Sequence, residues 1–254
     1  MKFINIIKAM FVKGQLEVMV NKLWLRFFDK KNQLSKSENF SWLKKESTDI
    51  AEFCKELNES LWDDIQLDVE RVYSDAKNHL IDIPFDLGGG GAFPLLYFIV
   101  RFSKPEIVVE TGVASGFSTY AILDALKSNK KGHLFSSDFP YFRLPNPEQF
   151  IGIVVPENLK KRWSLYTKGD NVNLPIINNK ISNIDVFHYD SDKSYSGRLA
   201  ALELLSEKIK NNSWVIIDDI QDNCFFHDFV FENNYKNWKV FEFEGKWVGL
   251  IYPD

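Results

Sequence analysis

Acidic residues stand at or just after the ends of five successive strand-like runs of this chain. Ligands of an open parallel sheet bind outside the carboxyl ends of its strands, so these acids would share one edge. A single carboxylate there usually caps a helix or faces solvent. The whole set instead favours a cationic or polyhydroxyl ligand. Its members are Glu110, Asp138, Asp170, Asp190 and the pair Asp218-Asp219.

The stretch from Glu110 to Ser118, ETGVASGFS, joins a strand to a helix. Gly112 and Gly116 stand where the backbone has to turn and let a ligand approach closely. The stretch lacks the G-x-G-x-x-G dinucleotide fingerprint, because Glu110 and Ser115 replace two of its glycines. An acid at this turn would repel a pyrophosphate and suits an ammonium or sulfonium group. An NAD-dependent Rossmann enzyme is therefore the weaker alternative.

Asp138 follows the second of these strands. A carboxylate in that position can accept hydrogen bonds from both hydroxyls of a ribose. A ribose together with a positively charged group describes S-adenosylmethionine. The sequence thus predicts S-adenosylmethionine as the cofactor.

A second constellation combines Asp190 with Asp218 and Asp219. Three carboxylates at adjacent strand ends need a counter-ion or a raised pKa. A hard divalent cation such as Mg²⁺ takes oxygen ligands and meets that need. Zinc is disfavoured, because the four histidines form no pair at ligand spacing. The alternative is that Asp219 caps the next helix.

Strands that alternate with helices are expected to position these residues. The pattern predicts an α/β fold with right-handed crossovers and a mostly parallel, Rossmann-like sheet. A C-terminal antiparallel hairpin around Glu244-Gly245-Lys246 would close one edge of that sheet. The expected strands are 107–109, 133–135, 163–166, 184–187, 214–217, 238–243 and 247–252, and the expected helices among them are 93–102, 118–127 and 195–210.

The first 85 residues read as a helical extension, a cap or an oligomerisation element, that precedes a domain of residues 86–254. Helices are expected near 47–58 and 60–80, with Ser47 or Thr48 and Ser60 as N-caps. An earlier apolar stripe at helical spacing favours a helix that packs on its own domain or on a partner subunit. The alternative is a basic helix on an anionic membrane surface. The stripe comprises Leu16, Met19, Val20, Leu23, Trp24, Phe27 and Phe28.

Composition describes a globular protein: 254 residues, 45% hydrophobic and 26% charged, with a net charge of -4. Residues 1–31 carry seven Lys or Arg against two acids, so the remainder is strongly acidic. Residues 86–254 offer no basic stripe, which disfavours nucleic acid as a partner. Two distant cysteines exclude a disulfide scaffold and fit a reducing compartment. The longest apolar run, Phe93 to Val100, is too short to span a bilayer, so a cytoplasmic location is expected.

Glu110 to Ser118 resembles the first motif of class I S-adenosylmethionine-dependent methyltransferases, with Ala114 in place of a frequent glycine. Residues 86–254 are similar to a bacterial branch of that superfamily related to metal-dependent O-methyltransferases of the catechol and macrolide-sugar kinds. The resemblance implies a seven-stranded sheet, a ribose contact at Asp138 and a metal at Asp190, Asp218 and Asp219. Its further implied cofactor residues are Glu110, Gly112, Ala114, Gly116, Ser118, Gly169, Asp170 and Asp190.

Lys193 lies three residues after Asp190, where the catechol-type enzymes carry a lysine that serves as general base. Relatives in the bacterial branch commonly have histidine there. A lysine can act as a base only if burial or a metal ion lowers its pKa. The equal alternative is an ordinary solvated lysine.

The resemblance implies O-methylation of a small molecule with neighbouring hydroxyls, such as a sugar. Mg²⁺ would chelate both oxygens and acidify one, and Lys193 would remove its proton. The alternative is a catalytically silent subunit that binds S-adenosylmethionine and assembles through its aromatic stripe, Trp24, Phe27 and Phe28. A homo-oligomer is compatible with either reading.

Overall fold

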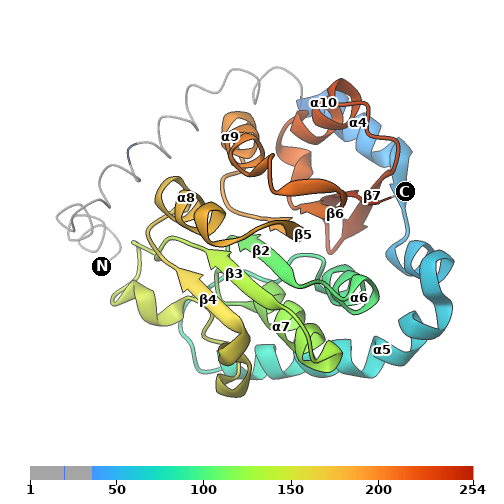
Figure 1. Ribbon diagram of the computed structural model, residues 1–254. Coiled ribbons are helices and arrows are strands. Elements are labelled where there is room, and N and C mark those ends of the chain that lie inside the picture. The colour runs from blue at the N-terminus through green and yellow to red at the C-terminus, as the bar shows by residue number, and fades with distance from the viewer. Residues whose placement is uncertain (1–19, 21–35, 254) are drawn as a thin grey trace.

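The computed structural model describes residue 20 and residues 36–253, and its central element is an eight-stranded sheet (Figure 1). The strand order is β1-β7-β8-β6-β5-β2-β3-β4. Every pairing is parallel except the two that β8 makes with β6 and β7. The strands are β1 Ser47–Thr48, β2 Ile107–Thr111, β3 His133–Ser137, β4 Trp163–Tyr166, β5 Ile184–Tyr189, β6 Ile209–Ile217, β7 Trp238–Phe243 and β8 Lys246–Ile251.

Helices cover both faces of the sheet. In Figure 1, α8 and α9 lie above it, and α5 and α7 lie below. Alternate residues of one strand enter opposite cores, as Val108 joins the α5, α6 and α7 side and Val109 joins the α8, α9 and α10 side. The helices are α4 Lys36–Glu46, α5 Ile50–Leu80, α6 Phe93–Ser103, α7 Phe117–Asn129, α8 Asp170–Lys180, α9 Tyr195–Leu205 and α10 Phe225–Glu232, and the 3₁₀ turns are η1 Pro147–Phe150, η2 Glu157–Arg162 and η3 Ile220–Asp222.

The predicted α/β fold is confirmed, and the predicted strand ends lie within five residues of the observed ones. The sheet has eight strands and not the seven that the resemblance implies, because β1 adds one at the edge. The expected helix 195–210 stops at Leu205, because the chain has to turn into β6 at Ile209. The C-terminal hairpin is confirmed but does not close the edge of the sheet. Its strand β7 also pairs with β1, which forms the edge.

The two helices predicted over residues 47–80 form the single element α5, broken at Asn58, where φ is -164° and ψ is 93°. Asp49 caps its start by accepting a hydrogen bond from the Glu52 amide at 2.9 Å. The predicted caps Ser47 and Thr48 are wrong, because both residues pair with β7. The predicted N-cap Ser60 is wrong as well. The Asn58 side chain caps the part of α5 after the break by accepting a hydrogen bond from the Leu61 amide at 3.0 Å.

The N-terminal segment contributes to the core. Phe53 and Ile65 of α5 lie in the same buried cluster as the residues of α6 and α7, and α4 contributes Leu43 to the opposite cluster. The role of residues 1–85 as a cap or an oligomerisation element stays a prediction. The amphipathic helix expected over residues 16–28 lies outside the described residues except for Val20, which is 51% exposed. Among the described residues, no helix combines the length and the hydropathy that a membrane crossing requires.

Asn39 anchors α4 to the turn η3, and its removal is expected to destabilise the fold. Its buried amide donates to the carbonyls of Ile220 and Asn223, both at 2.8 Å. Asn39→Ala leaves those two carbonyls unpaired and should lower the free energy of unfolding by about 1–3 kcal/mol. Urea unfolding followed by circular dichroism measures the loss. Ser41→Ala on the exposed side of the same helix is the control, and equal stability of the two variants would contradict the anchor.

Candidate functional site

The register of the sheet brings the predicted acids to one edge. Thr111 pairs with Ser137 of β3 and with Tyr189 of β5, and Tyr189 pairs with Ile217 of β6. The residue after each of these four positions therefore emerges beside its neighbours. Those residues are Gly112, Asp138, Asp190 and Asp218.

The turn from Gly112 to Gly116 requires small residues. Gly112 has φ +81°, and a Cβ there would lie 2.1 Å from the carbonyl oxygen of Asp190. Gly116 has φ +102°, and its Cβ would lie 2.8 Å from the Cα of Gly152. Ala114 between them also adopts a positive φ of 51°. The turn thus lies directly against the end of β5 and the segment after η1, with no room for side chains at either glycine.

Glu110 holds this turn from below. The side chain is fully buried and accepts hydrogen bonds from Ser118 and Thr119 of α7, each at 2.7 Å. It also accepts one from Ser136 of β3 at 2.8 Å. In this structure the Glu110 carboxylate therefore fixes the strand, the helix start and the neighbouring strand relative to one another.

Asp138 organises the second part of the edge. One carboxylate oxygen accepts from the Ala114 amide at 2.8 Å and the other from the Phe139 amide at 2.6 Å. Its backbone carbonyl accepts from the Gly169 amide at 3.0 Å and from the buried side chain of Asn173 at 3.2 Å. Asp138 is thus tied both to the glycine turn and to the start of α8.

Asp170, the first residue of α8, links two strand ends. It accepts a hydrogen bond from Ser137 at the end of β3 at 2.5 Å, and a second from Ser191 just after β5. The carboxylate thereby joins the segment after Asp138 to the segment after Asp190.

Asp190 and Asp218 lack sufficient positive charge around them. Burial and the nearby charge of Asp218 raise the pKa of Asp190 to about 8. Asp218 is 2% exposed, and among the described residues neither of its carboxylate oxygens has a hydrogen-bond partner. A Cβ on Gly91 would lie 2.0 Å from one of these oxygens, so only glycine fits beside it.

His188 of β5 is the nearest basic group behind these two carboxylates. It is fully buried, with Nδ1 3.6 Å from Glu110 and Nε2 3.9 Å from Asp218. Burial lowers its pKa, but the two carboxylates outweigh burial and raise the pKa to about 10. His188 therefore places one positive charge between the glycine turn and the end of β6.

Asp219 has a different environment from Asp218. Its carboxylate forms an ion pair with Lys193, accepts from Gln221 at 3.0 Å and lies 3.8 Å from the amine of Lys246. Burial raises the Asp219 pKa, but the contact with Lys193 outweighs it and the pKa is lowered. Although Asp219 occupies the N-cap position of η3, its side chain makes no capping hydrogen bond there.

The side chain of Lys193 is about half exposed, and its amine is paired with the carboxylate of Asp219. Burial lowers its pKa, but the hydrogen bond and charge of Asp219 outweigh burial and raise the pKa overall. A general base needs the opposite shift. Burial and a nearby metal ion were the two predicted ways of lowering the Lys193 pKa. Burial is insufficient here, so Lys193 could act as a base only beside a bound cation.

The predicted three-aspartate metal site is not formed. Within the described part of the chain, no three acidic, histidine or cysteine side chains converge on one point. The carboxylate of Asp219 points toward Lys193 and therefore does not join Asp190 and Asp218 in a metal site. Asp190 and Asp218 do fit a cation, because their charges repel each other and no described residue donates a hydrogen bond to the Asp218 oxygens. Mg²⁺ is commonly held by one or two carboxylates and several waters.

Arg198 is a supporting residue that sequence analysis missed. It is 1% exposed and donates to Asn223 at 2.9 Å and to the carbonyls of Asp218 and Asp219 at 3.2 and 2.8 Å. These bonds fix the turn that follows β6. The available signal was an arginine on the apolar face of α9, between Tyr195 and Leu202. His188 gave a weaker signal, a histidine inside a strand-like run.

A strap, residues 81–92, crosses the site between α5 and α6. Gly91 lies beside Asp218, and the carbonyl of Leu87 accepts a hydrogen bond from the Tyr141 hydroxyl at 2.8 Å. Phe85 contacts Phe150 edge to face, with ring centroids 5.7 Å apart. The strap is therefore joined to the segment after β3 on one side and to the end of β6 on the other.

Comparison with known proteins gives a consistent result. Residues 109–220 match a family model described as a methyltransferase domain. No curated protein sequence matches the chain significantly.

Solved structures share the fold. An O-methyltransferase from Bacillus cereus in complex with SAH matches 72% of this chain and 90% of its own, with a TM-score of 0.54 and 16% identity. A SAH-bound methyltransferase from Podospora anserina matches 78% of this chain and 97% of its own, with a TM-score of 0.53 and 13% identity. The O-methyltransferase TomG from Streptomyces achromogenes in complex with SAM matches 73% of this chain and 89% of its own, with a TM-score of 0.51 and 11% identity.

Tyr141 is expected to keep the strap closed over the site. Tyr141→Phe removes only the hydroxyl that donates to Leu87. Amide exchange in residues 81–92 should quicken about 3- to 10-fold, while the unfolding midpoint changes little, because one neutral hydrogen bond contributes about 1 kcal/mol. Hydrogen-exchange mass spectrometry measures the change. Tyr235→Phe, remote from the strap, is the control, and unchanged exchange in Tyr141→Phe would contradict the role of the tether.

Proposed function

We propose that the methyltransferase domain of this chain transfers the methyl group of S-adenosylmethionine to a hydroxyl oxygen of a small molecule. The observation that carries the proposal is the close-packed turn of Gly112 to Gly116, hydrogen-bonded to Asp138 at the carboxyl edge of a mostly parallel sheet. This edge is the general ligand position of open α/β sheets. The presence of SAM or SAH in similarly folded O-methyltransferases supports the choice of cofactor.

Each part of the cofactor has a proposed partner. The methionine portion would lie on the glycine turn, whose shape Glu110 maintains from beneath. Asp138 would accept hydrogen bonds from the ribose hydroxyls, since its backbone donors hold it in place at the edge. The adenine would lie near Gly169 and Asp170 at the start of α8. The proposed methionine-side residues are Glu110, Gly112, Ala114, Gly116 and Ser118, with Asp190 near the transferred methyl.

The acceptor would bind between the cofactor and the end of β6. Asp190 and Asp218 would hold Mg²⁺, which would supply the positive charge that binds and acidifies neighbouring hydroxyls. Asp219 would orient Lys193 toward the acceptor, and Lys193 would take the hydroxyl proton once its pKa is lowered. The oxygen would form a bond to the methyl carbon as the carbon–sulfur bond breaks, leaving the thioether S-adenosylhomocysteine.

The strap and the segment after β3 would enclose both reactants. The contacts of Tyr141 with Leu87 and of Phe150 with Phe85 join the strap to this segment. The main contribution of the chain would then be the positioning of two bound molecules and the exclusion of water. A vicinal diol, such as a sugar, fits a site that presents two carboxylates for one cation.

A catalytically silent subunit that binds S-adenosylmethionine is the second candidate. The observation that favours it is the ion pair between Lys193 and Asp219, which raises the pKa of the proposed base. Cofactor binding without methyl transfer to any diol of a panel would support this candidate.

Asp138 is expected to determine cofactor affinity. Asp138→Ala should weaken S-adenosylmethionine binding roughly 10- to 100-fold, because hydrogen bonds to a charged group contribute about 1.5–3 kcal/mol. Isothermal titration calorimetry measures the affinity. Asp64→Ala, exposed on α5, is the control, and Asp138→Asn keeps the side-chain shape if the alanine variant unfolds. A folded wild-type chain that does not bind S-adenosylmethionine would overturn the proposal.

Asp218 and Asp219 are expected to differ in metal binding. Asp218→Asn should abolish Mg²⁺ binding and lower methyl transfer at least about 100-fold, because removal of one charge unbalances the site. Asp219→Asn should keep Mg²⁺ binding, since its carboxylate pairs with Lys193. Calorimetry with Mg²⁺ and a methyl-transfer assay on a diol panel separate the two effects. Undiminished transfer in EDTA would remove Mg²⁺ from the mechanism but leave cofactor binding intact.

A further inference from the structure

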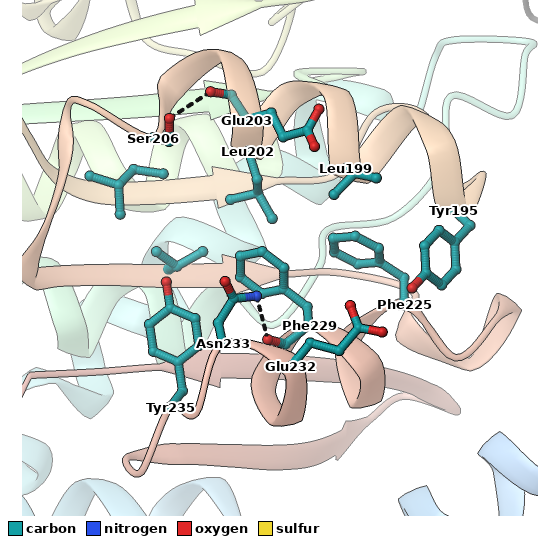
Figure 2. Close-up of a pocket in the computed structure, with 12 residues that line it drawn as sticks. Tyr195, Leu199, Leu202, Glu203, Ser206, Phe225, Phe229, Glu232, Asn233 and Tyr235 are labelled. Atoms are coloured by element: carbon teal, nitrogen blue, oxygen red, sulfur yellow. Dashed lines mark hydrogen bonds between the residues drawn. The ribbon is translucent and has the colours of Figure 1, made fainter.

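A groove between α9 and α10 shares no lining residue with the proposed active site and has no part in the proposed reaction. It has a volume of about 390 Å³ and runs from Tyr195 at one end to Tyr235 at the other (Figure 2). Its walls are apolar: α9 contributes Leu199 and Leu202, and α10 contributes Phe225 and Phe229.

The rim of this groove is acidic. Figure 2 shows Glu203 on the α9 wall and Glu232 on the α10 wall, on opposite sides of the groove. Both side chains are exposed, and neither forms an ion pair with another described residue. Tyr235 at the far end is 38% exposed despite its large apolar ring. An apolar floor with two carboxylates at its rim suits an occupant that is apolar on one side and carries a net positive charge.

The chain contains such an occupant in residues 16–30. Lys22, Arg26 and Lys30 follow one side of the apolar stripe defined above, and residues 1–31 carry an excess of five positive charges. Val20, a described member of the stripe, is 51% exposed. The net positive charge and the apolar side chains of the segment complement the acidic rim and the apolar floor of the groove.

The chain enters the described fold beside the same helix. Trp42 of α4 contacts His227 and Phe231 of α10, with ring centroids 5.0 and 6.5 Å apart. The groove lies on the face of α10 that carries Phe225 and Phe229. The connection between this segment and α4 is five residues, 31–35, and spans at most about 18 Å. A helix is about 10 Å wide, so the segment can reach across α10.

We propose that residues 16–30 dock in cis into the groove between α9 and α10. The aromatic residues of the stripe fill the apolar floor, and the basic residues beside the stripe pair with Glu203 and Glu232. Covalent attachment favours docking within one chain, because it supplies a high effective concentration at the groove. A second copy of the chain and an anionic membrane are the competing partners.

Charge reversal at the rim tests this docking on the full chain. Glu203→Arg with Glu232→Arg should quicken amide exchange in residues 16–30 by about tenfold, because two attractive contacts become repulsive. Glu59→Arg with Glu70→Arg on α5, which are exposed acids away from the groove, should leave exchange unchanged. Adding Lys22→Glu and Arg26→Glu to the rim variant should restore protection. None of these residues belongs to the proposed active site.

The measurement separates the competing partners. Protection of residues 16–30 that is independent of protein concentration and lost on rim reversal supports docking in cis. Protection that rises with protein concentration assigns the segment to a second copy and overturns the proposal. Protection that requires vesicles of anionic phospholipid assigns the segment to a membrane and also overturns the proposal. Exchange as fast as in an unfolded peptide also overturns it.

Discussion

The charge balance at the carboxyl edge of the sheet is the constraint on which the site depends. Parallel register places Asp190 and Asp218 at adjacent strand ends, where their charges repel and raise the pKa of Asp190. The chain supplies part of the compensation: His188 lies behind Asp218, and Lys193 pairs with Asp219. The remaining negative charge faces the space where a sulfonium and a metal ion are proposed to bind. The need for positive charge thus connects the architecture to the choice of ligands.

Much of the fold was predictable because the buried strands form short apolar runs that end at acids or glycines. The runs at 163–166 and 238–243 match β4 and β7 to the residue. The two-residue strand β1 was not predictable, because Ser47 and Thr48 have no apolar pattern and pair only through tertiary contact with β7. Asn58 illustrates the same limit: its side-chain cap interrupts α5 without a proline or glycine to mark the break.

The site was predictable in its residues more than in its contacts. Sequence order places Asp138, Asp190 and Asp218 after strands, and the register then makes them neighbours. Asp218 and Asp219 are adjacent in sequence but differ in environment, because the chain turns at Asp219 with φ 54°. One side chain stays buried without a hydrogen bond from any described residue, while the other pairs with Lys193. The different environments of Asp218 and Asp219 depend on one backbone turn. Arg198, on a helix twenty residues earlier in the chain, fixes this turn through its hydrogen bonds to the two carbonyls.

The segments that precede the sheet also complete the site. The strap between α5 and α6 has glycine at position 91 because the carboxylate of Asp218 occupies the space of a side chain. Tyr141 and Phe150 join the same strap to the segment after β3. A movement of α5 would therefore reach Asp218 through the backbone of the strap, without passing through the sheet.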